Sequence, residues 1–221
     1  MRASFEKMTT PRAPFVAALS AAVLACLAVP SSQAAGPATL ALTVRQASGL
    51  PVRDAVVMVY PKAGASSGPI RFGWKYDMAQ ANIAFTPGTL IVPAGATVRF
   101  PNQDKVRHSI YSFSKSAKID IQLYGRDETR SHSFAVPGSV ALGCKIHDQM
   151  RGYVKVVDTP YAAKTDHNGQ VRLAQLPGGA AVVKVWHPAL RSRTGEHEEA
   201  VMLVPGQPTT RAISVDLRPQ K

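Results

Sequence analysis

The stretch Gly143-Cys144-Lys145-Ile146-His147-Asp148-Gln149-Met150 carries a potential metal ligand at every third residue: a thiol, an imidazole and a thioether. Short, mostly apolar runs lie on either side of it, at 140–142 and 153–157, and the turn-forming pair Pro137-Gly138 precedes the first run. Runs of this length between turn signals are typical of β-strands. We therefore expect the three side chains to lie in one turn between two strands.

A second imidazole, His108, stands at the start of another predicted strand. Two histidines and a cysteine in a trigonal plane, with a weak axial methionine, form the ligand set of a mononuclear copper site. We predict that His108, Cys144, His147 and Met150 bind one copper ion. Zinc held by the cysteine and the two histidines is the main alternative. Each of these residues taken alone has an ordinary role in a β-protein, as a buried cysteine, a strand-end histidine or a packing methionine.

The rest of the sequence also predicts β-structure. The chain contains 17 prolines and 16 glycines, which favour frequent turns, and it is 45% hydrophobic and 18% charged, which allows a packed core. No helix is predicted. The predicted strands cover residues 40–44, 55–60, 89–92, 97–100, 109–113, 131–136, 140–142, 153–157, 171–173, 181–186, 201–204 and 212–215.

The first 34 residues have the features of a signal peptide. Basic residues precede an apolar run at 15–29, and small residues at 32 and 34 suit cleavage after Ala34. The run is shorter than the roughly 20 residues that cross a bilayer. We expect a periplasmic or secreted protein with no transmembrane span in the mature chain. An N-terminal anchor and lipidation at Cys26, in a weak lipoprotein box, are the alternatives.

Removal of this leader would leave Cys144 as the single cysteine. An exported protein with one cysteine cannot form an internal disulfide, and a free thiol outside the cytoplasm is easily oxidised. Cys144 is therefore expected to be either buried and inert or held by a metal.

The segment from about residue 70 to 157 resembles the cupredoxins, the group of plastocyanin and amicyanin. The matching residues are the run 85–102, FTPGTLIVPAGATVRFPN, followed by the four predicted ligands, whose Cys-x-x-His-x-x-Met spacing is closer to amicyanin. The resemblance implies a Greek-key β-sandwich with one copper ion near one end, which shuttles single electrons through a surface-exposed His147. Ser109 departs from the asparagine common in plastocyanins, and Lys145-Ile146 departs from the usual Ser/Thr-Pro, so loop rigidity and redox potential stay open.

The mature chain is also similar to bacterial plastocyanin-like proteins often labelled methylamine-utilisation proteins. The shared stretches are 106–114 (VRHSIYSFS), 141–148 (ALGCKIHD) and 156–161 (VVDTPY). The label does not establish a role in methylamine oxidation.

The flanks resemble a carboxypeptidase-regulatory-like domain, with its opening at 44–57 and its middle at 165–179. The expected fold is therefore all-β, a Greek-key cupredoxin sandwich inserted into or joined to a small carboxypeptidase-regulatory-like β-sandwich, after a cleaved signal peptide. In the alternative, the N-terminal strands extend the cupredoxin sheet. The expected parts are the signal peptide at 1–34, the first strands of the regulatory-like sandwich at 35–62, the cupredoxin domain at 68–158 and the remainder of the regulatory-like sandwich at 159–221.

The formal net charge of +12 is compatible with nucleic acid, an anionic membrane surface or an acidic protein as partner. Nucleic acid is not expected, because the exported chain lacks an aromatic and basic platform. Four cationic residues flank the predicted ligands and outnumber Asp104 and Asp148, so the expected partner is an acidic redox protein such as a periplasmic cytochrome or dehydrogenase. These cationic residues are Lys105, Arg107, Lys145 and Arg151.

The expected function is that of an exported blue-copper protein, not an enzyme, that carries single electrons between periplasmic redox partners. One alternative is a copper-binding module for storage, delivery or sensing without a dedicated redox partner. Another is a secreted adhesion or interaction protein with a vestigial metal site. Surface or turn roles are expected for the remaining histidines, His132, His167, His187 and His197.

Overall fold

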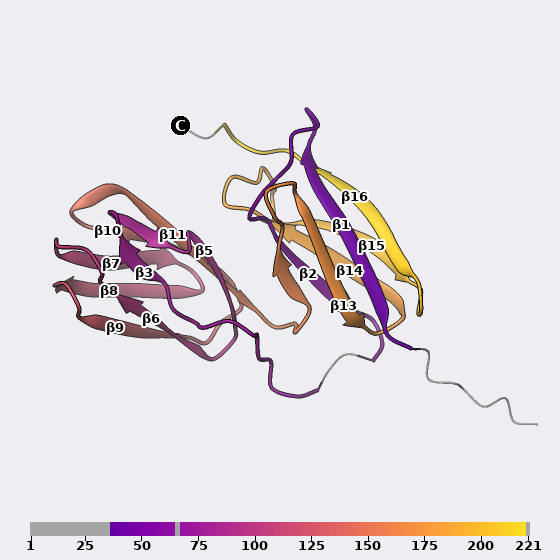
Figure 1. The fold of residues 1–221 in the computed structure, drawn as a ribbon, viewed down its shortest axis with the longest axis horizontal. Coiled ribbons are helices and arrows are strands. Elements are labelled where there is room, and N and C mark those ends of the chain that lie inside the picture. The colour runs from indigo at the N-terminus through magenta and orange to yellow at the C-terminus, as the bar shows by residue number, and fades with distance from the viewer. Residues whose placement is uncertain (1–35, 65–66, 220–221) are drawn as a thin grey trace, which may run out of the picture. The chain divides into compact units, whose positions relative to one another are not determined.

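The computed structural model describes residues 36–64 and 67–219, and every regular element in these residues is a β-strand, as predicted (Figure 1). The predicted signal peptide with its cut after Ala34, and the alternative at Cys26, lie outside the described residues. Within the described part of the chain, no helix has the length and hydrophobicity of a membrane span.

Sixteen strands follow one another along the described residues. They are β1 (Ala38–Gln46), β2 (Val56–Pro61), β3 (Ala79–Ala81), β4 (Ala84–Thr86), β5 (Thr89–Pro93), β6 (Ala96–Pro101), β7 (His108–Ser114), β8 (Ala117–Tyr124), β9 (Thr129–Phe134), β10 (Gly138–Cys144), β11 (His147–Val157), β12 (Ala162–Lys164), β13 (Gln170–Leu176), β14 (Gly179–Trp186), β15 (His197–Leu203) and β16 (Pro208–Val215).

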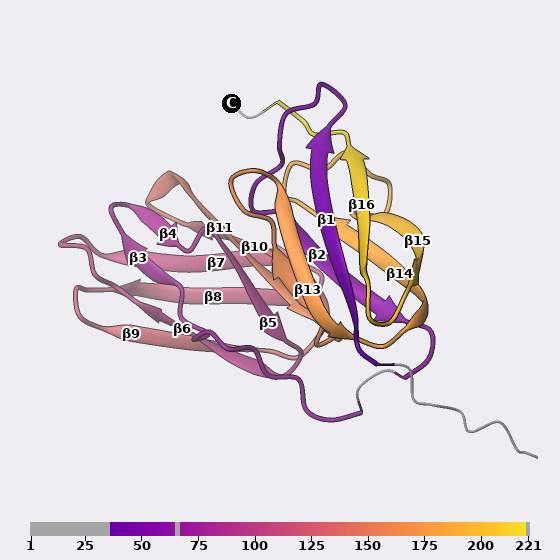
Figure 2. The same cartoon turned by 45° about the vertical axis from the view of Figure 1, so that its right-hand side comes forward.

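Strands β3 to β11 form one sandwich (Figure 2). Its larger sheet has the order β5-β11-β10-β7-β8, in which β5 runs parallel to β11 and the other pairs are antiparallel. The hairpin β3–β4 and the pair β6–β9 lie in the other layer, where a parallel bridge from Gln80 to Asn102 connects β3 to the chain that follows β6. On β6, Val98 and Phe100 are buried while Thr97 and Arg99 are exposed, because neighbouring strand residues point to opposite faces. The buried core between the layers includes Phe100, Ile110, Tyr124, Phe134, Val140 and Val154.

The strands from the two ends of the described chain form sheets of their own. The sheet β13-β1-β16 pairs β1 antiparallel with β13 and parallel with β16, and the sheet β12-β2-β14-β15 pairs β2 with β12 and β14. A second core includes Leu40, Val57, Val183 and Ile213. Strands β1 and β2 thus pair with strands from residues 162–215 and with none of β3 to β11. If the N-terminal strands extended the cupredoxin sheet, as in the alternative, they would pair with a strand of that sheet.

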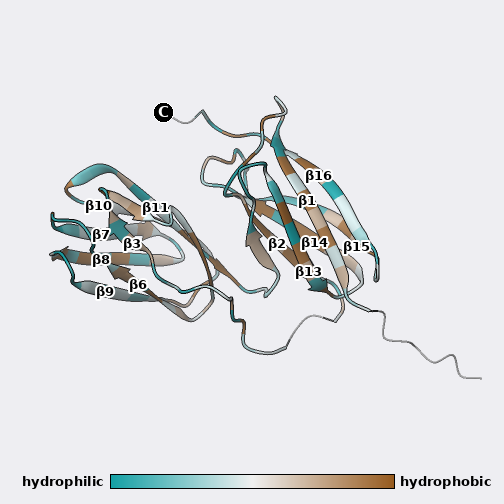
Figure 3. Cartoon of the chain, in the orientation of Figure 1, coloured by the Kyte–Doolittle hydropathy of each residue, from teal (hydrophilic) through white to brown (hydrophobic). Residues whose placement is uncertain are grey.

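Four strands were missed from the sequence, and one was misplaced. Strands β3, β4 and β12 have only three residues each, too few for a periodic pattern. Strand β8 (AKIDIQLY) alternates apolar and polar residues, but only Ile119 and Tyr124 are buried, so its signal is weak. Strand β9 covers 129–134 rather than 131–136, because its pairing with β6 ends where Phe134 faces Ala96. Hydrophobic residues, brown in Figure 3, recur within the strands of both sandwiches.

Candidate metal centre

Three neighbouring strands of the five-stranded sheet carry the predicted ligands. Strand β7 begins at His108, β10 ends at Cys144, and β11 begins at His147. Strands β10 and β11 form a hairpin in which Cys144 faces His147 across a two-residue turn. Since β10 also pairs antiparallel with β7, with Gly143 opposite Tyr111, the start of β7 lies beside the end of β10. Backbone pairing therefore brings the three side chains to one end of the sheet.

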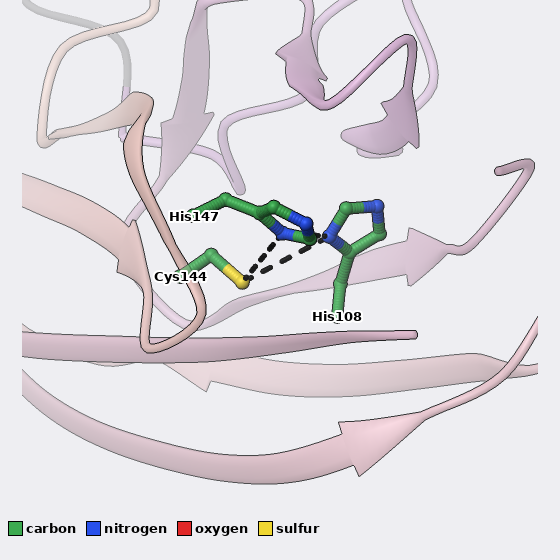
Figure 4. A group of neighbouring side chains, drawn as sticks. All are labelled: His108, Cys144 and His147. Carbon is green, nitrogen blue, oxygen red and sulfur yellow. Dashed lines mark hydrogen bonds between the residues drawn. The ribbon is translucent and has the colours of Figure 1, made fainter. Parts of the chain in front are cut away.

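The three side chains point toward a common centre (Figure 4). The Nδ1 atoms of His108 and His147 are 3.1 Å apart. The Cys144 Sγ lies 3.8 Å from the first of these nitrogens and 3.6 Å from the second. Each residue offers one ligand atom, and together they form a group that could hold a metal ion.

The size of this triangle fits one transition-metal ion. The point equidistant from the three atoms lies about 2.0 Å from each of them, close to the roughly 2.0–2.3 Å at which imidazole nitrogen and thiolate sulfur bind zinc. Soft thiolate together with imidazole also suits copper. The residues present therefore fit a single ion, and the size of the triangle alone does not separate copper from zinc.

The donors differ in their exposure. His108 is fully buried and Cys144 is 2% exposed, whereas His147 is partly exposed. The thiol is thus shielded from solvent and from oxidants, and the His147 imidazole is the part of the group nearest to solvent.

Ser109 connects the two strands that bear His108 and Cys144. Its buried hydroxyl accepts a hydrogen bond from the Lys145 backbone N–H at 2.9 Å and lies 3.8 Å from the Cys144 Sγ. The Ser109 backbone N–H points at the same sulfur, at 3.5 Å. A serine at this position therefore holds the loop and places two hydrogen-bond donors beside the thiol.

Asp104 holds the other side of the His108 ring. Its Oδ2 lies 2.8 Å from His108 Nε2, and its two oxygens accept the backbone N–H groups of Asn82 at 2.6 Å and Ile83 at 2.9 Å. Burial alone would raise the pKa of Asp104, but the hydrogen bonds from Ile83, His108 and Asn82 outweigh it and lower that pKa below its usual value. The group is therefore a carboxylate at neutral pH.

Met150 lies inside β11, not in the turn. The turn consists of Lys145 and Ile146 alone, because β11 already begins at His147. Met150 is 1% exposed and packs in the same core as Cys144. Its role as axial ligand stays a prediction.

Of the four cationic residues around the group, one is paired with a carboxylate. Lys145 forms an ion pair with Asp120, which the sequence did not indicate, and Arg107 donates a hydrogen bond to the Leu123 carbonyl at 3.0 Å. Lys105 and Arg151 are exposed. The net positive charge at this end is therefore smaller than the sequence suggested.

The remaining histidines lie outside the donor group. The His132 ring contacts the Phe134 ring, with the ring centroids 5.0 Å apart, and His197 lies 2.9 Å from a Glu199 carboxylate oxygen. His187 Nδ1 accepts the backbone N–H of Ala189. Among the described residues, His108, Cys144 and His147 form the one cluster of such side chains with metal-binding spacing.

Two residues that support the group were missed as such from the sequence. Asp104 precedes His108 by four residues, but the sequence shows it only as a nearby negative charge, and it shows Ser109 only as a departure from the asparagine common in plastocyanins. An acidic residue shortly before a predicted histidine ligand is the signal that could have indicated Asp104, since ligand histidines commonly donate their other ring N–H to a carboxylate.

No family model and no curated protein matches the chain. Among solved structures, part of the chain is similar to a Cu-containing nitrite reductase from Thermus scotoductus SA-01. The match has 23% sequence identity and a TM-score of 0.37, and it covers 43% of this chain and 25% of that chain. The chain thus spans about a quarter of that reductase. A purple cupredoxin from Nitrosopumilus maritimus is 22% identical over 37% of this chain and 98% of its own, with a TM-score of 0.34. A variant of amicyanin is 19% identical over 46% of this chain and 98% of its own, with a TM-score of 0.36.

The sandwich of β3 to β11 has a cupredoxin-like fold. Its two layers, its mixed five-stranded sheet and the His-Cys-His group at one end of that sheet agree with the fold expected from the sequence. For the sandwich of β1, β2 and β12 to β16, the resemblance to a carboxypeptidase-regulatory-like domain stays a prediction.

Proposed function

We propose that this chain is an exported blue-copper protein that carries single electrons between periplasmic redox partners and is not an enzyme. The observation that carries the proposal is the triangle of His108 Nδ1, Cys144 Sγ and His147 Nδ1, whose sides of 3.1, 3.6 and 3.8 Å suit one ion. When bound, copper would supply one-electron chemistry, in which a reduced partner loses one electron and an oxidised partner gains one. Met150 is proposed as the weak axial ligand.

The protein holds the donor atoms in place through its own hydrogen bonds. Asp104 fixes the outer edge of the His108 ring, and Ser109 ties the strand of His108 to the turn after Cys144. A site whose donors are held by neighbouring strands changes little when the charge of a bound ion changes. Such rigidity favours rapid electron transfer over the uptake and release that storage or delivery requires.

The route for electrons is proposed to pass through His147, because its ring is partly exposed whereas His108 is fully buried. Lys105 and Arg151 are exposed at this end of the sandwich and support an acidic partner such as a cytochrome or dehydrogenase. The apolar leader supports export, with cleavage after Ala34.

Voltammetry of the copper-loaded protein, combined with a test of copper release, examines the carrier function. A carrier is expected to show a reversible wave of one electron per chain and to keep its copper after reduction in the presence of a moderate Cu(I) chelator. A slow, irreversible wave with transfer of Cu(I) to the chelator would instead support storage or delivery. Binding to a partner protein that does not depend on metal or on its redox state would support the interaction protein.

A further inference from the structure

Asp104 is placed to act on the metal centre through His108. The His108 ring has one nitrogen, Nδ1, in the donor triangle, and its other nitrogen points away from Cys144 and His147 (Figure 4). That second nitrogen lies 2.8 Å from Asp104 Oδ2. A carboxylate accepts hydrogen bonds and donates none, so Nε2 carries the proton and Nδ1 keeps its lone pair free for a metal.

Asp104 is itself held by a second element. The hairpin β3–β4 turns at Asn82 and Ile83, both with a positive φ of 55°, and their successive backbone N–H groups converge on the carboxylate. Consecutive N–H groups in such a turn form a concave anion-binding site. The Asp104 backbone N–H in turn donates to the Asn102 side-chain oxygen at 2.9 Å. The hairpin thus holds the Asp104 carboxylate, and Asn102 holds the Asp104 backbone.

We propose that Asp104 is a positioning residue that orients His108, selects its Nδ1 as ligand and favours the higher charge of Cu(II) over Cu(I). This inference rests on the proposed copper function for its redox part only. A negative charge in contact with a ligand imidazole increases the electron donation of that imidazole, and it attracts a doubly charged ion more strongly than a singly charged one. The redox potential of the site is then lower than that of the same four ligands without Asp104.

Two variants separate the charge from the hydrogen bond. The Asp104 carboxylate accepts three hydrogen bonds. Its Oδ2 accepts two of these, from Ile83 and His108, and its Oδ1 accepts the third, from Asn82. In Asp104→Asn, the amide oxygen can take the Oδ2 position and keep both bonds, while its NH₂ faces the Asn82 N–H. Asn therefore removes the charge and keeps the contact with His108, whereas Asp104→Ala removes both. Asp148→Asn is the matched control, since Asp148 is an exposed neighbour of His147 whose loss makes the same charge change.

The first readout is the competition of each variant with chelators for Cu(II) and for Cu(I). Loss of such a supporting residue typically weakens metal affinity about 10–100-fold. In Asp104→Ala, we expect the affinity for Cu(II) to fall by this factor and the affinity for Cu(I) to fall less. Asp104→Asn should weaken both affinities in the same direction but to a smaller extent. Asp148→Asn should change either affinity only slightly. The redox part of the proposal would be overturned if Asp104→Asn and Asp148→Asn changed the copper affinities equally. It would also be overturned if Asp104→Ala weakened the binding of Cu(I) as much as that of Cu(II).

The second readout needs no metal. In ¹⁵N-resolved NMR spectra of the metal-free protein, the His108 Nε2–H is expected to give a slowly exchanging signal, because the ring is fully buried and bonded to Asp104. The signal should be lost in Asp104→Ala and retained in Asp148→Asn. A proton on Nδ1 instead, or a protected Nε2–H in Asp104→Ala, would overturn the positioning role even if the protein proved to bind zinc rather than copper.

Discussion

The Ser109 hydroxyl offers a sharp test of how the protein sets the redox potential. Ser109→Ala removes the hydroxyl contact to the Cys144 sulfur at 3.8 Å and the acceptor of the Lys145 backbone N–H at 2.9 Å, while the Ser109 backbone N–H at 3.5 Å from the sulfur remains. A thiolate bound to Cu(I) carries more negative charge than one bound to Cu(II), so a hydrogen bond to it stabilises the reduced form more. Its loss should therefore lower the potential.

The magnitude follows from the strength of a single hydrogen bond. A typical bond contributes about 0.5–1.5 kcal/mol, and roughly 1.36 kcal/mol corresponds to about 59 mV for one electron. The expected decrease is thus about 20–60 mV. The Lys145 N–H that loses its acceptor should cost about 1 kcal/mol of unfolding free energy, which lowers Tm by about 2–4 °C for a chain of this size.

Ser112→Ala is the control for this experiment. Ser112 is also buried on β7 and accepts the Ser114 backbone N–H at 3.1 Å, so its loss should lower Tm by a similar amount. It makes no hydrogen bond to Cys144, so the potential should stay as in the unmodified protein. The assays are redox titration of the copper-loaded proteins and thermal unfolding of the metal-free ones. An unchanged or higher potential in Ser109→Ala, or an equal decrease in Ser112→Ala, would refute the reasoning.

Met150→Leu should retain copper and raise the redox potential by tens of millivolts, on the order of one axial donor's contribution. If redox titration gives the same visible spectrum and potential as for the unmodified protein, Met150 is a packing residue only. Gly152→Ala should destabilise the metal-free sandwich by about 1–3 kcal/mol, because a Cβ there would lie 2.7 Å from the Phe85 Cβ. Gly73→Ala is the control, since a Cβ at Gly73 would meet open space. Thermal unfolding should show the loss of stability in Gly152→Ala and not in Gly73→Ala. Stopped-flow transfer to a candidate acidic cytochrome should slow by about tenfold between low salt and about 0.15 M, with a weaker salt dependence in Lys105→Glu. A flat salt dependence in both proteins would exclude steering by charge.

The fold class and two of the three donors were predictable, because both depend on short-range sequence signals. Apolar runs between turn residues indicated most strands, and the spacing of Cys144 and His147 on one hairpin indicated two of the donors. The sequence indicated His108 as a donor only through the chemistry of the copper ligand set, because its position beside the other two depends on the pairing of β7 with β10, two strands that are far apart in the sequence.

The supporting contacts of the site could not be predicted, because they join residues far apart in sequence. Asp104 meets the turn at Asn82 and Ile83 from more than twenty residues away, through a hairpin too short to show a pattern. Lys145 is paired with Asp120, which lies on β8, so the sequence overestimated the free charge near the site.

The central claim is that Cys144, with His108 and His147, holds one copper ion. Stepwise addition of Cu(II) to the purified full chain, followed by visible absorption, tests it most directly. We predict an intense thiolate-to-copper charge-transfer band that saturates at one copper per chain, persists in Cys26→Ala and is absent in Cys144→Ala, although the latter variant stays folded. A band that survives in Cys144→Ala, or copper bound without any such band in the unmodified protein, would contradict the account.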